Sequence, residues 1–344
     1  MPNRIAEKKR APRNRTLVLD DSDRARLRPR LIQKLGAAPE ELINATVFGD
    51  FSDFAQHVTK PFVDLLVLDP PYNLNKAFNG LRFKKKKVAD YTEWLDGIVS
   101  TLIPLLRPHA TVYICGDWHT SASIFEVASR YFVVRNRITW EREKGRGAKT
   151  NWKNSSEDIW FCTLDDEFTF NVVSVKLRRK VIAPYTNADG SPKDWNNSVD
   201  GKFRDTHPSN LWTDITIPFW SMPENTDHPT QKSEKLLARL ILASSNKGNL
   251  VLDPFVGSGT TSVVAKKLER NYLGIEIDEE FCLLTERRLE LAETNRLIQG
   301  YDENVFWERN TLAERQKLAG SSSKNGEDKR TNGDNSSDQP AFEF

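Results

Sequence analysis

Cysteine is scarce in this 344-residue chain, which has only Cys115, Cys162 and Cys282. Their wide separation argues against a disulfide framework and against the paired spacing of a zinc site. The five histidines show no ligand spacing either, so we expect no metal ion. Long apolar runs are also missing, and the basic N-terminus is not followed by an apolar region. We therefore expect no membrane span, no secretion signal and a cytoplasmic location.

Excess charge of one sign is missing too, because 50 lysines and arginines face 48 acidic residues and leave a net charge of +2. Any surface for nucleic acid must then be a local patch, since the overall field is weak. The length allows a full hydrophobic core and favours one large α/β domain with an inserted or appended region. Strand-like and helix-like segments alternate along most of the chain, which predicts a parallel, doubly wound sheet.

The apolar run 62–68 ends in Asp69, Pro70, Pro71 and Tyr72. Such a run predicts a strand buried on both faces, whose end lies where a parallel sheet delivers side chains to a ligand crevice. Asp69 supplies a carboxylate acceptor, the prolines stiffen the backbone, and Tyr72 supplies a flat ring. Together they suit a planar amino group attached to a ring. Four residues alone are equally compatible with a strand end and a proline turn.

A glycine turn follows the predicted strand 250–253 and opens a helix. A phosphate loop needs a lysine after the last glycine, where threonines stand here, and a dinucleotide fingerprint needs a third glycine, where Ser262 stands. Asp253, directly before the turn, repels a pyrophosphate but attracts an ammonium group, which S-adenosylmethionine has. Glu276 ends the next strand about twenty residues later, where an acid accepts hydrogen bonds from ribose hydroxyls.

Three segments are rich in basic residues: the run 84–87, which is all lysine, the loop 141–154, which also holds Trp152, and the irregular stretch 165–227, where basic and aromatic residues alternate. Contact with DNA and simple solvation are the alternatives for the first two. The third is too long and too rich in turn residues for packing alone, which favours recognition. The candidates for DNA contact are Lys84, Lys85, Lys86, Lys87, Arg146, Lys149, Trp152, Arg178 and Arg179.

Asp-Pro-Pro-Tyr at 69–72, His-Pro-Thr-Gln-Lys at 228–232 and Asp-Pro-Phe-Val-Gly-Ser-Gly-Thr-Thr at 253–261 occur in that order. In this order the three motifs resemble those of the bacterial DNA amino-methyltransferases of the β group, of restriction-modification type. The resemblance implies an α/β fold with a circularly permuted, Rossmann-like, S-adenosylmethionine-dependent methyltransferase sheet and an inserted target-recognition region. It also implies that Asp50 meets the cofactor's adenine and Lys232 its methionine end. The candidates for cofactor binding are Asp50, Lys232, Asp253, Phe255, Gly257, Ser258, Gly259, Thr260 and Glu276.

The resemblance covers roughly residues 43–295, and the divisions outside that span rest on composition and pattern alone. We expect a flexible basic arm at 1–30, a catalytic half at 31–164, target recognition at 165–227 with the loop 141–154 around a flipped base, a cofactor half at 228–300, a C-terminal helix at 301–319 and a disordered tail at 320–344.

The expected activity is site-specific transfer of a methyl group from S-adenosylmethionine to the N6 amino group of adenine in double-stranded DNA after base flipping. The resemblance associates aspartate at the first motif position mainly with adenine, and cytosine N4 is the alternative because the geometry serves both amino groups. A DNA-binding module without catalysis, or methylation of RNA or a small molecule, would leave either the intact motifs or the 165–227 insert unexplained. A cognate restriction endonuclease is compatible with the resemblance, and the chain is either a monomer or a homodimer.

Overall fold

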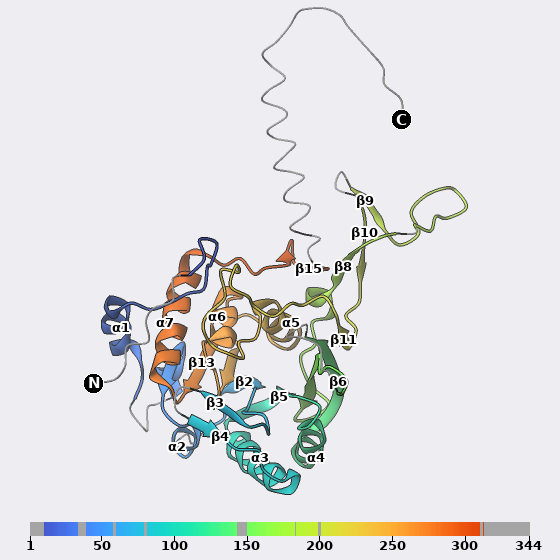
Figure 1. The fold of residues 1–344 in the computed structure, drawn as a ribbon. Helices are drawn as coiled ribbons and strands as arrows, with labels where there is room; N and C mark the ends of the chain where they lie inside the picture. Colours follow the sequence, from blue (N-terminus) through green and yellow to red (C-terminus); the bar gives the residue numbers. More distant parts are fainter. Residues whose placement is uncertain are drawn as a thin grey trace, which may run out of the picture.

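The computed structural model describes residues 10–33, 39–57, 60–78, 81–142, 150–182, 184–198, 201–309 and 312. In this part of the chain a central eight-stranded sheet lies between two layers of helices, and a smaller five-stranded sheet extends to one side (Figure 1). The predicted mixed α/β, Rossmann-like architecture is therefore confirmed.

The central sheet has the order β1-β13-β12-β2-β5-β7-β6-β11. Its strands are β1 (Ala45–Phe48), β2 (Val63–Leu68), β5 (Leu106–Gly116), β6 (Val133–Glu141), β7 (Ser156–Thr163), β11 (Leu211–Trp212), β12 (Leu250–Asp253) and β13 (Asn271–Glu276). Neighbours pair in parallel, except that β7 runs antiparallel to both β5 and β6. The prediction of a wholly parallel sheet is wrong at β7. Strands that follow each other without a crossover helix pair antiparallel, and the described part of the β6–β7 connection holds no helix.

Strand β2 lies in the middle of this sheet and is covered on both sides. Leu66 and Leu68 belong to one hydrophobic core, whereas Leu65 and Val67 belong to the other. Period-two alternation therefore sends the side chains from Leu65 to Leu68 alternately into the two cores, which is why this part of the strand is apolar on both faces, whereas Asp64 near its start accepts hydrogen bonds from Arg107 and Leu250 N–H.

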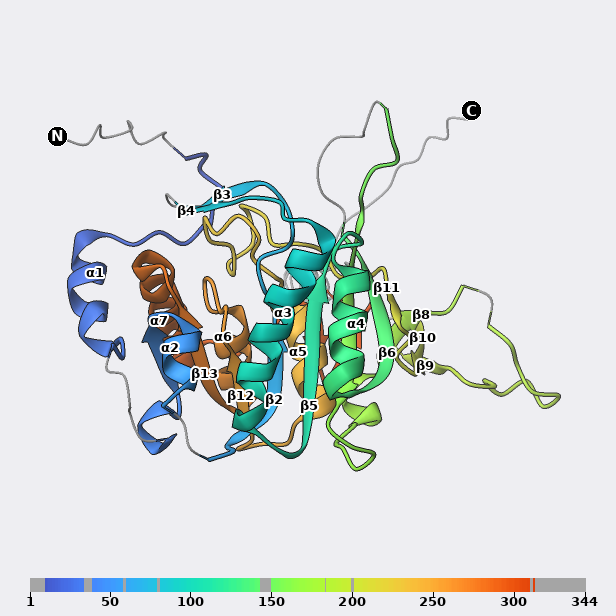
Figure 2. The same cartoon turned by 90° about the horizontal axis from the view of Figure 1, so that it is seen from below.

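Six helices form the two layers, and Figure 2 shows two of them, α3 and α4, in front of the sheet. The first layer contains α2 (Phe51–Ala55), α3 (Val88–Leu102) and α4 (Ser121–Tyr131), and the second contains α5 (Glu234–Ser244), α6 (Thr260–Lys267) and α7 (Glu279–Thr294). Short 3₁₀ turns occur at Arg28–Arg30, Pro39–Leu42, Ile103–Leu105 and Val172–Val175.

The segment 10–30 is ordered against the rest of the molecule, so the prediction of a flexible arm is wrong for it. Helix α1 (Asp21–Leu27) packs on α7, and its Arg24 lies 2.8 Å from Glu280 of that helix. The sequence alone could not assign Glu280 to Arg24, because the fold brings together two helices that lie far apart in the chain. Residues 1–9 lie outside the described residues.

The second sheet has the order β14-β15-β8-β10-β9. Its strands are β8 (Leu177–Lys180), β9 (Asn196–Ser198), β10 (Gly201–Thr206), β14 (Tyr301–Asp302) and β15 (Val305–Trp307). The C-terminal strands thus join the 165–227 region, and the predicted helix at 301–319 is wrong for 301–309. Residues 310–311 and 313–344, including the predicted tail, lie outside the described residues. A small hairpin, β3 (Lys76–Phe78) with β4 (Leu81–Phe83), follows Tyr72.

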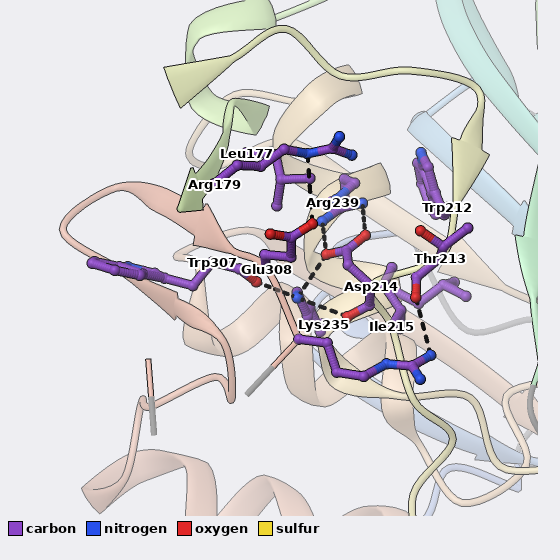
Figure 3. A network of polar contacts seen from close by, with 12 residues as sticks. Leu177, Arg179, Trp212, Thr213, Asp214, Ile215, Lys235, Arg239, Trp307 and Glu308 are labelled. Carbon is purple, nitrogen blue, oxygen red and sulfur yellow. Dashed lines mark hydrogen bonds and ion pairs between the residues drawn. The ribbon is translucent and has the colours of Figure 1, made fainter. Parts of the chain in front are cut away.

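A buried ionic network joins the two sheets to α5 (Figure 3). Asp214 accepts two hydrogen bonds from Arg239, at 3.1 and 2.8 Å, and lies 2.7 Å from the Lys235 ammonium. Lys235 also donates to the Trp307 carbonyl of β15. Burial alone raises the pKa of Asp214, but the charges of Arg239 and Lys235 outweigh burial and hold it below its usual range.

Candidate active site

A cavity of about 660 Å³ opens at the carboxyl ends of β1, β2, β12 and β13. This is the edge at which parallel sheets place ligands. Nine of the predicted site residues line the cavity, together with several that the sequence did not single out. The nine are Asp50, Asp69, Pro70, Pro71, Tyr72, Lys232, Phe255, Gly257 and Glu276.

Asp69 and Tyr72 lie directly after β2, and both contact Lys232. The Lys232 ammonium lies 2.7 Å from Asp69 Oδ2 and 3.1 Å from the Tyr72 hydroxyl, and that hydroxyl lies 3.0 Å from Asp69 Oδ1. Burial alone lowers the pKa of Lys232, but the charges of Asp69 and Glu157 outweigh it and raise the pKa above its usual range. The motif 228–232 therefore reaches the end of β2 and brings a permanent positive charge to it.

Glu157 is one of the cavity residues that sequence reasoning missed. Its carboxylate is buried, with Oε2 3.2 Å from both the Tyr72 hydroxyl and the Lys232 ammonium. Arg142 binds the other carboxylate oxygen. The only signal in the sequence is that Glu157 and Asp158 stand together at the start of an apolar strand. Asp158 accepts hydrogen bonds from Ser121 and Thr139 and does not enter the cavity. Only the register and direction of β7 show which acid enters the cavity.

The Pro71 carbonyl accepts a hydrogen bond from the Tyr91 hydroxyl at 3.2 Å, which fixes the backbone after Asp69. Of the two proline carbonyls, that of Pro71 is thereby committed to helix α3. Pro70, which stands between Asp69 and Pro71, also lines the cavity.

Across the cavity, the glycine turn between β12 and α6 faces Glu276 at the end of β13. Glu276 accepts hydrogen bonds from Gly257 N–H at 3.0 Å and Asp278 N–H at 2.9 Å. Burial raises the pKa of Glu276 above its usual value. Gly259 has φ +84°, and a Cβ there would lie 2.5 Å from Thr285, so no side chain fits.

Asp253 lies beneath this turn and is not among the residues that line the cavity. Its carboxylate accepts hydrogen bonds from Thr261 Oγ1 at 2.5 Å and Phe255 N–H at 3.0 Å. Burial raises its pKa to about 7, and these two hydrogen bonds offset only part of the effect. The structure therefore places Asp253 as a support of the glycine turn.

Ser258, Gly259 and Thr260 also lie behind the cavity wall. The Ser258 carbonyl accepts a hydrogen bond from Arg288, and Thr260 Oγ1 donates to the Lys232 carbonyl at 3.2 Å. The glycine turn is thereby tied to the motif at 228–232, and the two motifs form one unit although they come from separate elements.

The model of a DNA methylase family matches residues 63–287. The chain belongs to this DNA methylase family.

Among the relatives, it is 32% identical over 251 residues to DNA adenine methyltransferase YhdJ of Escherichia coli, covering 72% of this chain and 82% of that protein. It is 31% identical to type II methyltransferase M1.MboII of Moraxella bovis, over 67% of this chain and 90% of the relative. The fold resembles that of the PvuII cytosine-N4-specific DNA methyltransferase, with a TM-score of 0.54, 15% identity, and coverage of 85% of this chain and 95% of that one.

S-adenosylmethionine is the methyl donor of this methylase, and the residues present fit it. The glycine turn leaves its backbone bare toward the cavity. At Gly257 no side chain has room, since a Cβ there would lie 2.9 Å from His228. The carboxylate of Glu276 and the end of β1 at Asp50 supply polar groups, and Phe51 and Phe255, with ring centroids 5.1 Å apart, supply an apolar wall. When bound, the sulfonium supplies an electrophilic methyl group.

The predicted DNA contacts fall in different places. The lysines at 84–87 are exposed and follow the β3–β4 hairpin, and Trp152 is 94% exposed. Arg178 is committed to Asp205, at 2.7 and 2.9 Å, and to Glu303. Arg146 and Lys149 lie outside the described residues.

Arg179 is the more available of the adjacent pair in β8. Its side chain is 44% exposed and lies 3.9 Å from Glu308. Within the described ranges, no helix is long and apolar enough to cross a bilayer, and no group of three or more histidine, cysteine or acidic side chains is placed to hold a metal ion.

Proposed function

We propose that this methylase transfers a methyl group from S-adenosylmethionine to the N6 amino group of adenine at specific sites in double-stranded DNA. The observation that carries the proposal is that Asp69 and Glu276, at the ends of β2 and β13, line one cavity. In this proposal the Asp69 carboxylate receives the target amine and the Glu276 carboxylate binds the cofactor. Support for adenine comes from relatives named for adenine methylation, of which YhdJ is one.

An exocyclic amino group is a poor nucleophile, because its lone pair is delocalised into the ring. Asp69 and the Pro70 carbonyl are proposed to accept hydrogen bonds from its two N–H groups, which turns the nitrogen toward tetrahedral geometry and aims its lone pair at the methyl group. The target base must first leave the duplex stack. Tyr72 offers a ring on which it stacks, and the Tyr72 hydroxyl holds that ring in place by donating to Asp69 or to Glu157 and accepting from Lys232.

The DNA surface is proposed to combine the exposed run Lys84–Lys87, Trp152 and Arg179. The lysines supply affinity for phosphates. The second sheet, with the rest of 165–227, is proposed to read the sequence, because it carries basic and aromatic side chains beside the catalytic sheet. Arg178 has its role within this sheet, as the partner of Asp205. A partner restriction endonuclease, the oligomeric state and the cytoplasmic location stay predictions.

The decisive experiment is expression in a host that lacks DNA methylation, followed by mass spectrometry of digested DNA and sequencing for modified bases. The proposal requires N6-methyladenine within one recurrent sequence. N4-methylcytosine would overturn the choice of base while leaving the role of Asp69, because the same acceptors serve either amine.

Base flipping has its own test. A duplex with 2-aminopurine at the target position should brighten on binding, since flipping removes the stacking that quenches it. Tyr72→Ala should raise the cost of holding the base out by about 1–3 kcal/mol, as for other base–aromatic contacts. Tyr72→Trp should preserve much of the contact. Equal fluorescence for wild type and Tyr72→Ala would contradict the stacking role.

A further inference from the structure

Two carboxylates, from Asp69 and Glu157, compete for the same two donors. The Tyr72 hydroxyl lies 3.0 Å from Asp69 Oδ1 and 3.2 Å from Glu157 Oε2. The Lys232 ammonium lies 2.7 Å from Asp69 Oδ2 and 3.2 Å from Glu157 Oε2. Each donor therefore has a partner at the end of β2 and an alternative partner on β7.

The two donors differ in how many hydrogens they carry. Lys232 has three, and its three partners are Asp69, Glu157 and the Tyr72 oxygen. Tyr72 has one, so its two hydrogen bonds are alternatives and cannot exist together. Burial and both neighbouring carboxylates raise the pKa of Tyr72 well above its usual value, so the hydroxyl keeps its hydrogen.

Asp69 Oδ1 has the Tyr72 hydroxyl as its donor among the described residues. While that hydrogen points at Oδ1, it occupies the carboxylate that has to receive the target amine. When the hydroxyl turns to Glu157, Oδ1 becomes an open acceptor at the cavity wall. A rotation about one C–O bond is enough, and no side chain has to leave its place.

Glu157 is fixed for this purpose. Its Oε1 is bound by Arg142, whose backbone N–H donates to the Ser155 carbonyl at 2.6 Å, so Oε2 stays directed at Tyr72 and Lys232. Arg142 and Lys232 together balance the two carboxylates. Glu157 is therefore more than a counter-ion for a buried lysine, because Asp69 already fills that role at the shorter distance.

We propose that Glu157 is a positioning residue. It accepts the hydrogen bond of the Tyr72 hydroxyl and shares the Lys232 charge, and so frees Asp69 to accept a hydrogen bond from the target amino group. The inference rests on the proposed function only in requiring an exocyclic amine, of adenine or of cytosine. It gives a role in the reaction to Glu157 of β7, which lies outside the three sequence motifs.

The test is a single-turnover measurement of methyl transfer with saturating cofactor and DNA. In Glu157→Gln, we expect Arg142 to keep its hydrogen bond to the side-chain oxygen. The amide nitrogen then faces Tyr72, and the alternative acceptor for the Tyr72 hydroxyl is lost. The rate should fall about 10–100-fold, the factor that corresponds to one hydrogen bond to a charged group. Affinities for cofactor and for DNA, measured by calorimetry and fluorescence, should stay within about twofold, since neither ligand has lost a contact.

The second variant separates positioning from mere support. Tyr72→Phe removes the hydrogen that blocks Asp69 and keeps the ring, and its own single-turnover rate is measured as the reference for the double variant. Added to Glu157→Gln, it should restore a large part of the lost rate, because nothing then occupies Oδ1. A structural role for Glu157 predicts the opposite, with two damaging substitutions making the double variant the slowest.

Asp158→Asn is the matched control, because this neighbouring carboxylate of β7 faces Ser121 and Thr139 on the other side of the sheet. It should leave the single-turnover rate unchanged and thereby show that a lost charge in β7 is not itself harmful. An unchanged rate in Glu157→Gln, a slower double variant, or loss of cofactor binding in Glu157→Gln would overturn the proposal. Wild-type transfer to neither adenine nor cytosine would instead overturn the proposed function.

Discussion

The Lys232 ammonium lies 2.7 Å from the Asp69 carboxylate, although 163 residues separate the two in the sequence. The pair joins the end of β2 to the segment that leads into α5, and so connects the tetrapeptide 69–72 with the motif at 228–232. Because the Lys232 carbonyl also accepts a hydrogen bond from Thr260, the pair links the tetrapeptide to the start of α6, next to the glycine turn.

Asp69→Ala should abolish methyl transfer while S-adenosylmethionine still binds. The substitution removes the acceptor for the amine, whereas the glycine turn and Glu276 lie on other strands, and Lys232 keeps Glu157 as a partner. Calorimetry with the cofactor and a tritium-transfer assay separate the two properties. Loss of cofactor binding together with retained turnover would reverse the assignment of the two motifs.

Asp214→Asn should lower the free energy of unfolding by about 3–5 kcal/mol, because it leaves Arg239 and Lys235 buried without their counter-charge. Chemical denaturation at neutral pH measures the loss. Asp96→Asn is the control, since Asp96 pairs with the half-exposed Arg130 and should cost less than about 1 kcal/mol. Equal costs for the two variants would show that the network in Figure 3 contributes no more than a surface pair.

The wild-type network also has a pH dependence. The pKa of Asp214 is lowered in the folded state, so its stabilising contribution is present above the unfolded value of about 3.9 and is lost as the pH falls below it. Asp214→Asn should therefore be less sensitive to acid than wild type in the range below about pH 4.

Asp253→Asn should stabilise the free protein at pH 8. A carboxyl whose pKa rises to about 7 on folding favours the folded state at low pH, and that advantage is lost as the pH rises from about 4, the unfolded value, to about 7. The gain has an upper bound of about 4 kcal/mol for a shift of this size. Thermal unfolding from pH 4 to 8 should show the two curves separating as the pH rises. A constant difference across this range would mean that Asp253 does not titrate as described.

Neutralising Lys84, Lys85, Lys86 and Lys87 to glutamine should flatten the salt dependence of DNA binding by up to about four phosphate contacts without changing the methylated sequence. These lysines are exposed and lie away from the second sheet. Lys247, exposed in the connection between α5 and β12 and paired with Glu269, is the control, and its replacement should leave the slope unchanged. A new methylated sequence in the quadruple variant would refute this division of labour.

Asp69 to Tyr72 and the glycine turn could be located from sequence, because each motif sits at the end of a strand that is recognisable by local pattern alone. Glu157 could not, since its neighbour Asp158 has the same local signature and only the antiparallel register of β7 separates them. Asp253 was found, but its orientation depends on Thr261, a contact within the turn that spacing does not reveal.

Helix α1 and the strands β14 and β15 show the same limit at the ends of the chain. An arginine-rich segment is compatible with solvent until α7 provides Glu280 and its neighbours. Strands of two and three residues are too short to show an alternation of apolar and polar side chains. β15 is a strand because it pairs with β8.

The strand order has a consequence for biosynthesis. β2 emerges early but lies beside β12, with Leu66 opposite Leu252, and β1 is paired with β13, with Val47 opposite Ile275. A ribosome adds about 5–20 residues per second, so β12 is synthesised roughly 10–40 s after β2. During that time the apolar side of β2 that faces α5 and α6 has no cover, because both helices are still to be made. The cavity can therefore form only when translation has passed β13, whose last residue, Glu276, lines it.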